Sequence, residues 1–326
     1  MFRLPALHAE PQVLVLGGAG FIGRHVLAAL GQRRCRIVVS SRHPLRIDAR
    51  IPVGAVRCPR RTARFEALLT ARDWDTLLDG IDIVVNCVGI LRQRGAETYE
   101  RVHHQAPAAL AQACAARAVR LVHVSALALH DDAGSRFLRS KLAGERAIQG
   151  SAADWRIVRP SLLDGPDGYA SRWLRWLAKL PVHAFPADAT GRIAALHVDD
   201  LGEAIATVAL APALRPDESR EFEFGGDAAV PLAGMLASLR GSGRRDAWQV
   251  RLPPLLARAL AHACDALHFS PFSYGHWELL RRDNLPATNR LREVLGRAPR
   301  RIGEPSTPLP AAGFAPETNR ASPLPH

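Results

Sequence analysis

The apolar positions of this 326-residue chain fall into short unbroken runs separated by longer amphipathic stretches. An unbroken run such as VLVL at residues 13–16 predicts a strand buried on both faces, and apolar residues three and four apart predict a helix. Strand runs and helical stretches alternate through the first 160 residues. Strands are predicted within CRIVVSSRHP (35–44), VGAVRC (53–58), IDIVVNCVGIL (81–91), RLVHVSALA (120–128) and WRIVRPSLLDGP (155–166), and helices follow Gly23 and lie within RFEALLTA (64–71) and APAALAQACAARA (106–118).

This alternation predicts an α/β fold, a Rossmann-type doubly wound parallel sheet, with ligand at the carboxyl ends of the strands. We expect a nucleotide-binding core over residues 1–160. A small C-terminal α/β lobe follows over residues 161–301, with one or two of its elements returning to the core. The proline-rich residues 302–326 have little apolar periodicity and are predicted to be disordered.

The stretch VLVLGGAGFIGRHVLAAL carries the first recognisable chemistry. Its glycines are three apart, and each serves a different need of a bound dinucleotide: a tight turn, close approach of the backbone to phosphate, and close packing of helix on strand. The amino end of the following helix offers N–H groups to the pyrophosphate. The predicted contacts are Gly17, Gly20, Phe21, Ile22 and Gly23.

The end of the second strand indicates which dinucleotide is bound. An NAD site usually has a carboxylate here for the ribose 2′-hydroxyl, whereas an NADP site needs a cation. This chain offers Ser40, Ser41 and Arg42, and no acidic residue before Asp48. The pattern favours NADP(H), with Arg42 on the 2′-phosphate and Arg24 as a second cation; the alternative is that Arg42 is a solvated arginine in an arginine-rich protein.

Eight further motifs support a family resemblance. In chain order they are GGAGFIGRH, VVNCVGIL, TYERVHHQAP, LVHVSALA, FLRSKLAGE, VRPSLLDGP, ALHVDDLGEAI and ELLRRDN. With them the chain resembles an atypical, extended-type short-chain dehydrogenase/reductase. It is most similar to the family of the nicotinamide-binding accessory subunit of respiratory complex I and its bacterial relatives. The resemblance implies a Rossmann domain, bound NADP(H), and a role that is often structural.

The resemblance also implies roles for residues at the active site. Lys141 is expected to bind the nicotinamide ribose, Ser125 to orient a substrate carbonyl, and Pro160 and Ser161 to lie beside the nicotinamide. Cys87, Val88 and Gly89 would let the cofactor lie against the backbone. Active relatives have a tyrosine four residues before the lysine, and this chain has Phe137; the adenine-binding aspartate is replaced by Arg57-Cys58-Pro59.

Phenylalanine has no proton to donate, and a positioned acid typically contributes about 10²- to 10⁴-fold in rate. The sequence therefore predicts a cofactor-binding protein with little or no carbonyl reductase turnover and a structural, assembly or regulatory role. The alternative is an active NADP-dependent oxidoreductase, epimerase or dehydratase on a small or nucleotide-linked substrate. Its substitute acid would be His130, Tyr169 or a water on Ser125, although His130 is interpreted as a loop residue. His103 and His104 are interpreted as helix-surface residues, and Asp200 with Glu203 as helix caps.

The composition limits the partners and the cellular location that the sequence predicts. The formal net charge of +12 comes almost entirely from arginines spread along the chain, so no nucleic-acid partner is expected. Five cysteines without a C-x-x-C pair indicate a reduced cytoplasmic protein without a structural metal. No apolar run is long enough for a membrane span. The basic, tryptophan-bearing helix YASRWLRWLAKL (169–180) either covers the core of its lobe or contacts a partner or the inner-membrane surface peripherally.

Overall fold

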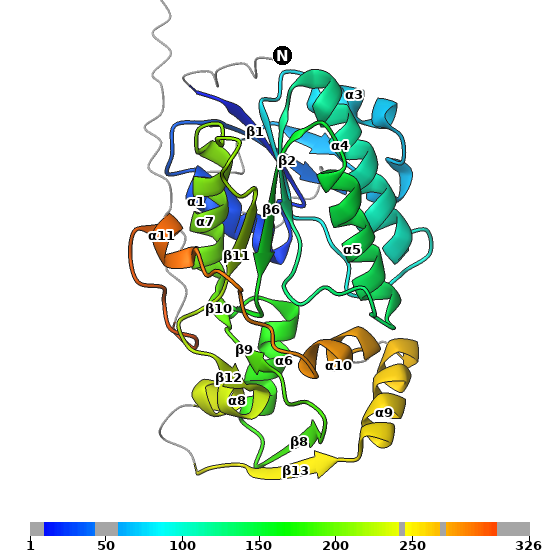
Figure 1. Cartoon of the computed structure of the whole chain (residues 1–326), viewed down its shortest axis with the longest axis vertical. Helices are drawn as coiled ribbons and strands as arrows, with labels where there is room; N and C mark the ends of the chain where they lie inside the picture. Colours follow the sequence, from blue (N-terminus) through cyan, green and yellow to red (C-terminus); the bar gives the residue numbers. More distant parts are fainter. Residues whose placement is uncertain (1–9, 43–57, 241–244, 268–271, 305–326) are drawn as a thin grey trace, which may run out of the picture.

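The computed structural model describes residues 10–42, 58–240, 245–267 and 272–304 (Figure 1). Its central sheet contains β1 (Gln12–Leu16), β2 (Arg36–Ser41), β3 (Arg60–Thr62), β4 (Ile83–Asn86), β5 (Arg120–Val124), β6 (Asp154–Pro160) and β11 (Glu221–Phe224). These strands pair in parallel in the order β11-β6-β5-β4-β1-β2-β3. The chain reverses direction across the sheet between β1 and β4, which is the Rossmann switch point. The predicted doubly wound α/β fold is confirmed.

Helices cover both faces of the sheet (Figure 1). One face packs against α1 (Phe21–Leu30), α7 (Val198–Leu210) and α11 (Leu291–Leu295), and the other against α3 (Asp75–Leu78), α4 (Ala106–Arg117) and α5 (Arg136–Gln149). Because side chains alternate along a strand, Val13 and Val15 of β1 face the α1 side whereas Leu14 and Leu16 face the α4 side. Burial on both faces explains why the strands appear in the sequence as unbroken apolar runs.

The C-terminal lobe lies beyond the carboxyl ends of the strands and is built from small sheets and helices (Figure 1). Its helices are α6 (Tyr169–Ala178), α8 (Leu232–Arg240), α9 (Pro254–Leu267) and α10 (Tyr274–Leu280). Three two-stranded sheets pair β7 (Leu163–Asp164) with β10 (Leu196–His197), β9 (Arg192–Ile193) with β12 (Val230–Pro231), and β8 (Val182–Pro186) with β13 (Trp248–Leu252).

Two local predictions in the first half of the core need correction. The helix expected at residues 64–71 is replaced by two short 3-10 helices, η1 (Phe65–Ala67) and η2 (Ala71–Trp74). Trp74 is fully buried and packs edge-on against Phe65, so the segment is held by two aromatic anchors instead of a helical stripe. Most of the stretch predicted as the third strand lies outside the described residues, and the described edge strand is β3.

The acidic pair at the start of α7 has a different role from the predicted cap. The helix begins at Val198, and the side chain of His197 accepts a hydrogen bond from the Asp199 N–H. Asp200 is fully buried and bonds Arg297 and Arg300, which Glu203 also contacts. These ion pairs attach the last described segment of the chain to the core.

Helix α6 packs inward. Leu174, Leu177 and Ala178 join Leu236 of α8 in the hydrophobic core of the lobe. The sequence allowed two roles for this helix, covering the core of its lobe or contacting a partner or membrane, and these contacts correspond to the first.

Candidate functional site

The glycine loop between β1 and α1 leaves no room for side chains. Gly17 has φ +74°, a left-handed conformation that glycine adopts without strain, and its carbonyl accepts from the Gly20 N–H at 2.8 Å. A Cβ on Gly23 would lie 2.2 Å from that carbonyl oxygen. Helix α1 therefore begins directly against the loop, at Phe21, with Gly20 as an N-cap that makes no side-chain bond. Such a helix amino end fits a pyrophosphate.

The end of β2 lies next to this loop, because the Gly18 N–H donates to the Ser40 carbonyl at 3.2 Å. Ser40 is buried and Ser41 is half-buried. The Arg42 side chain is 60% exposed and forms an ion pair with Glu97, from the loop after β4. Arg42 thus directly follows β2 and has a carboxylate partner that the sequence did not predict.

Arg24 is occupied elsewhere. Its guanidinium is buried in α1 and pairs with Asp167 at 2.5 Å, in the loop before α6. His25 beside it bonds Asp199 of α7 at 2.6 Å. Arg24 therefore attaches the core to the lobe through Asp167.

The end of β4 lies against the other side of the glycine loop. A Cβ on Gly17 would meet the Val88 side chain at 3.0 Å and the Cys87 backbone at 3.4 Å. The Val88 N–H donates to the Asn86 side chain, which also bonds His123 of β5 at 3.0 Å. Gly89 follows and is exposed. Burial raises the pKa of the Cys87 thiol to about 12, so this thiol stays protonated and uncharged at neutral pH.

Phe137 and Lys141 lie one turn apart on α5, as their spacing predicted. Ser135 caps the helix by accepting from the Leu138 N–H. The Lys141 Nζ lies 5.9 Å from the centroid of the Phe137 ring. Burial lowers the pKa of Lys141 to about 8. An aromatic face next to the ammonium provides a cation–π contact but no proton.

Three aromatic side chains surround the Phe137 ring. Tyr99 lies edge-on at 5.7 Å, His103 edge-on at 5.5 Å, and His276 of α10 stacks at 5.9 Å. This aromatic cluster, with Phe137 at its centre, was missed at the sequence level because its members come from three distant segments.

The prediction that His103 is a surface residue was wrong. It lies in η3 (Glu100–Gln105), a π-helix before α4, and is 3% exposed. Its Nε2 accepts from the Ile90 N–H at 3.1 Å, and its Nδ1 bonds Ser140 of α5 at 3.1 Å. Burial, with the charge of Lys141, holds the pKa of His103 well below its usual range. His104, in contrast, is half-exposed and pairs with Glu100.

Ser125 directly follows β5, and Pro160 ends the adjacent strand β6. The Ser125 N–H donates to Val158, and its buried Oγ has no hydrogen-bond partner within the described residues. A buried hydroxyl without a partner is costly unless a ligand or water completes it. Ser161, next to Pro160, bonds Asn284 at 2.6 Å.

A cavity of about 360 Å³ lies against Phe137, between the core and α9 and α10. Aromatic and polar side chains from both lobes line it, including Tyr99, His262, Asp265 and Tyr274. Tyr274 is stacked on His262 at 4.4 Å. Such a mixed cavity is of the size that small-molecule ligands use.

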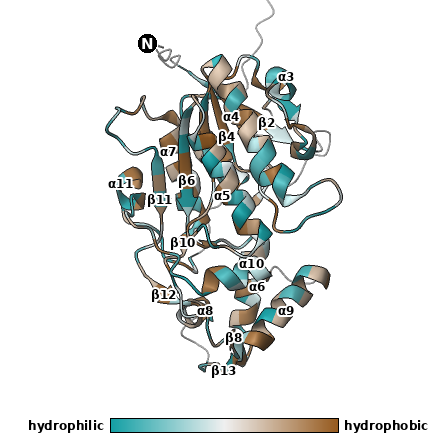
Figure 2. Ribbon diagram, turned by 45° about the vertical axis from the view of Figure 1, so that its right-hand side comes forward, coloured by the Kyte–Doolittle hydropathy of each residue, from teal (hydrophilic) through white to brown (hydrophobic). Residues whose placement is uncertain are grey.

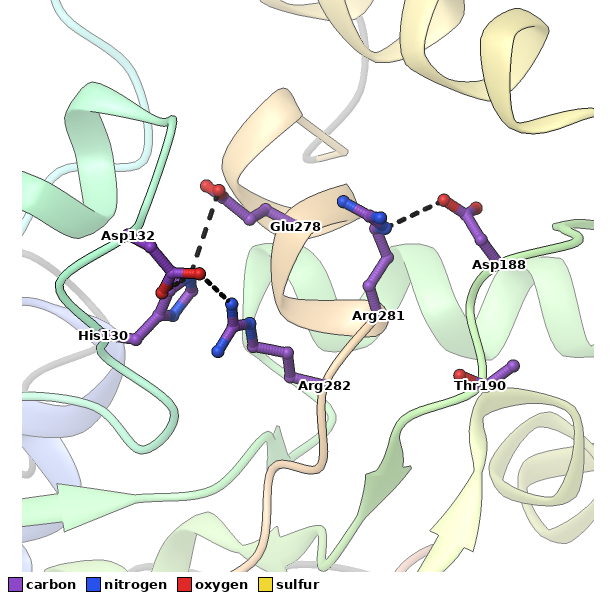
Figure 3. Close-up of a pocket in the computed structure, with 7 residues that line it drawn as sticks. All are labelled: His130, Asp132, Asp188, Thr190, Glu278, Arg281 and Arg282. Carbon is purple, nitrogen blue, oxygen red and sulfur yellow. Dashed lines mark hydrogen bonds and ion pairs between the residues drawn. The ribbon is translucent and has the colours of Figure 1, made fainter.

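A second cavity, of about 520 Å³, is strongly polar (Figure 3). Arg282 pairs with Asp132 at 2.5 Å and Arg281 with Asp188 at 2.9 Å, while His130 lies 3.9 Å from Glu278. Glu278 also accepts from the Gly134 and Ser135 N–H groups, so it bridges α10 to the start of α5. His130 is a loop residue as expected. Its location in this cavity was not foreseen.

The described ranges contain neither a metal-binding cluster nor a membrane-spanning helix. No group of three or more histidine, cysteine, aspartate or glutamate residues there has the arrangement to hold a metal ion. None of the helices described has the length and apolarity to cross a bilayer. Tyr169, one suggested substitute acid, is a half-exposed residue at the start of α6.

Comparison with known proteins agrees with this geometry. Residues 17–174 match a family model described as NAD(P)H-binding. The chain is 29% identical to a ceramide reductase of Caulobacter vibrioides over 302 residues, which are 88% of this chain and 90% of that protein. It is 28% identical to NADH dehydrogenase [ubiquinone] 1 alpha subcomplex subunit 9, mitochondrial, of Mus musculus over 176 residues, 52% of this chain but only 45% of that protein.

The fold is also found among solved structures. MoeE5 in complex with UDP-glucose and NAD superposes with a TM-score of 0.57 at 21% identity, over 89% of this chain and 94% of the other. At this identity the match concerns the fold alone.

Proposed function

We propose that the chain, which matches an NAD(P)H-binding family model over residues 17–174, is a short-chain dehydrogenase/reductase-like protein that holds NADP(H) and reduces carbonyls little or not at all. Its role would be structural, in assembly or regulatory. The observation that carries the proposal is Phe137. The ring occupies the place of the usual phenol, beside a lysine that remains.

The cofactor half of the site supports binding. The glycine loop, the uncapped start of α1 and the buried Ser125 hydroxyl all fit a dinucleotide. Arg42 supports NADP(H), because a 2′-phosphate would compete with Glu97 for its guanidinium. Lys141 has a use without chemistry, since an ammonium can donate to ribose hydroxyls.

Turnover tests this proposal most directly. We expect the purified chain to bind NADPH in a fluorescence titration yet to oxidise it slowly with a panel of ketones. Phe137→Tyr, which adds only a hydroxyl, is expected to raise that rate about 10²-fold or more, because a proton donor is restored beside Lys141.

The matched control is Tyr99→Phe, which removes the hydroxyl of a tyrosine in contact with Phe137. This variant should oxidise NADPH as slowly as the unmodified protein does. Fast NADPH oxidation by the unmodified chain with a defined ketone would disprove the loss of turnover.

A second candidate is a reductase for a lipid-like carbonyl compound. It is favoured by the similarity to a ceramide reductase over nine-tenths of that protein's length, and by the cavity against Phe137 that both lobes form. When bound, a reduced nicotinamide would supply a hydride to the carbonyl carbon. Lys141 would then be the proton donor: its Nζ–H bond breaks, the proton joins the carbonyl oxygen, and water reprotonates the amine. A donor with a pKa near 8 is suited to this step at neutral pH.

The two candidates differ in the pH dependence of the rate. The pKa of Lys141 is lowered from 10.5 to about 8, so its acid form is present below pH 8 and is lost above it. If Lys141 donates the proton, kcat/KM for a long-chain keto-amide falls about tenfold per pH unit above pH 8. Lys141→Met abolishes the reaction, and Lys179→Met, which changes the other, exposed lysine, does not. A flat profile, or activity in Lys141→Met, would exclude the lysine as donor.

A further inference from the structure

Large apolar side chains are exposed at one end of the C-terminal lobe. Figures 1 and 2 show the elements that carry them. They come from β8, β13 and α9, which follows β13 after one proline. Trp248 is 80% exposed, Leu255 81% and Leu267 70%. We call this set the α9 surface; it comprises Val182, Trp248, Val250, Leu255, Leu256, Leu260 and Leu267.

The two-stranded part of the α9 surface has one apolar face open to solvent. Val182 pairs with Trp248, and Ala184 with Val250, so all four side chains point to the same side of the ribbon. On the opposite face, His183 and Phe185 of β8 are buried, whereas Gln249 and Arg251 of β13 are exposed. A ribbon of this kind normally places its apolar side inward and its polar side outward.

Helix α9 shows the same inversion. Its buried side chains are small: Ala257, Ala261 and Cys264 lie on the lobe side. Its leucines point outward, and Leu256, Leu260 and Leu267 repeat at helical spacing, so they form one stripe. Small residues inside and leucines outside are typical of a helix whose larger contact is with another body.

We propose that the α9 surface inserts into the interface of an anionic lipid bilayer. The charge of the chain is complementary to such a bilayer, because the net charge is +12 and both β13 and α9 carry an exposed arginine. Arg251 lies on the ribbon face opposite to Val250, and Arg258 lies over the Tyr274 ring, so both border the apolar side chains. Of the two acids between residues 245 and 267, Asp265 is already paired with Arg92 at 3.1 Å. An exposed tryptophan beside leucines and arginines is suited to the boundary between head groups and acyl chains.

This location differs from the one that the sequence suggested. The basic helix α6 uses Leu174, Leu177 and Ala178 for the core of the lobe and leaves Trp176 exposed, whereas α9 leaves all its leucines outside. Helix α9 also supplies His262 and Asp265 to the cavity against Phe137. The same helix therefore contributes to both the cavity and the α9 surface.

Vesicle flotation with the full chain tests the proposal. Vesicles of equal parts phosphatidylglycerol and phosphatidylcholine are compared with vesicles of phosphatidylcholine alone. We expect the chain to float with the anionic vesicles, and added salt to weaken the binding. Trp248→Gln combined with Leu255→Gln should lower the partition constant about tenfold or more, because two exposed apolar side chains no longer enter the lipid.

The control is Trp176→Gln, which replaces an exposed tryptophan on α6 and should leave flotation unchanged. NADPH titration of every variant separates this result from the proposed function and shows that each variant is folded. The proposal is overturned if the chain stays unbound with anionic vesicles, if the double variant floats like the parent, or if Trp176→Gln loses as much. A dimer by light scattering that the double variant dissociates, without vesicle binding, would show that a second copy covers the surface.

Discussion

The glycine loop and the surroundings of Phe137 lie at the same edge of one sheet, yet they differ in what they have kept. At the loop, the tight turn at Gly17, the close packing of Gly23 and the open start of α1 all remain. At α5, Lys141 lies beside the ring of Phe137, at the position where the family resemblance leads us to expect a tyrosine.

The difference follows from how each region works. Pyrophosphate binding depends on backbone N–H groups and on absent side chains, so many residues must stay small together. Proton transfer at the usual position depends on one phenolic oxygen. A single change from tyrosine to phenylalanine can therefore remove turnover while the dinucleotide site stays intact.

The largest expected effect comes from a substitution in the glycine loop. In Gly23→Val the new Cβ would overlap the Gly17 carbonyl oxygen at 2.2 Å, so the loop or the helix must move. We expect NADPH affinity to fall at least about a hundredfold, because the pyrophosphate loses both the loop and the helix amides. Isothermal titration calorimetry measures the loss.

Gly150→Ala is the matched control, since a Cβ at this helix end would lie 3.4 Å from the nearest atom, with φ −76°. Its affinity should equal that of the parent. Unchanged binding in Gly23→Val would mean that the dinucleotide does not lie on this loop.

The sequence predicted the regions whose signal is local. Buried parallel strands appear as apolar runs, so five of the core strands could be located from the pattern alone. The glycine loop and the Phe137–Lys141 turn were equally readable, because their residues are near neighbours in the chain and their geometry depends on spacing.

The regions that were missed depend on contacts between distant segments. His103 has the sequence environment of a surface residue, and only the close approach of α5 makes it buried; a Cβ on Gly144 would lie 1.9 Å from the His103 carbonyl oxygen. Asp200 and Glu203 fit a capping pattern, and their true partners, Arg297 and Arg300, lie almost a hundred residues away. A glycine or an acidic residue in a helix can indicate close packing or an ion pair, but the sequence does not show which distant segment it contacts.

The smallest expected effect comes from Arg42, which follows β2, and distinguishes NADPH binding from NADH binding. Arg42→Gln should weaken NADPH binding about tenfold and leave NADH binding unchanged, because only NADPH has a 2′-phosphate for the guanidinium to bind. Glu97→Gln is the informative counterpart: it removes the carboxylate that pairs with Arg42, so NADPH affinity should rise a few-fold. Equal losses for both nucleotides in Arg42→Gln would assign that ion pair to holding the loop after β4 in place, and the preference for NADP(H) would then lack its cation.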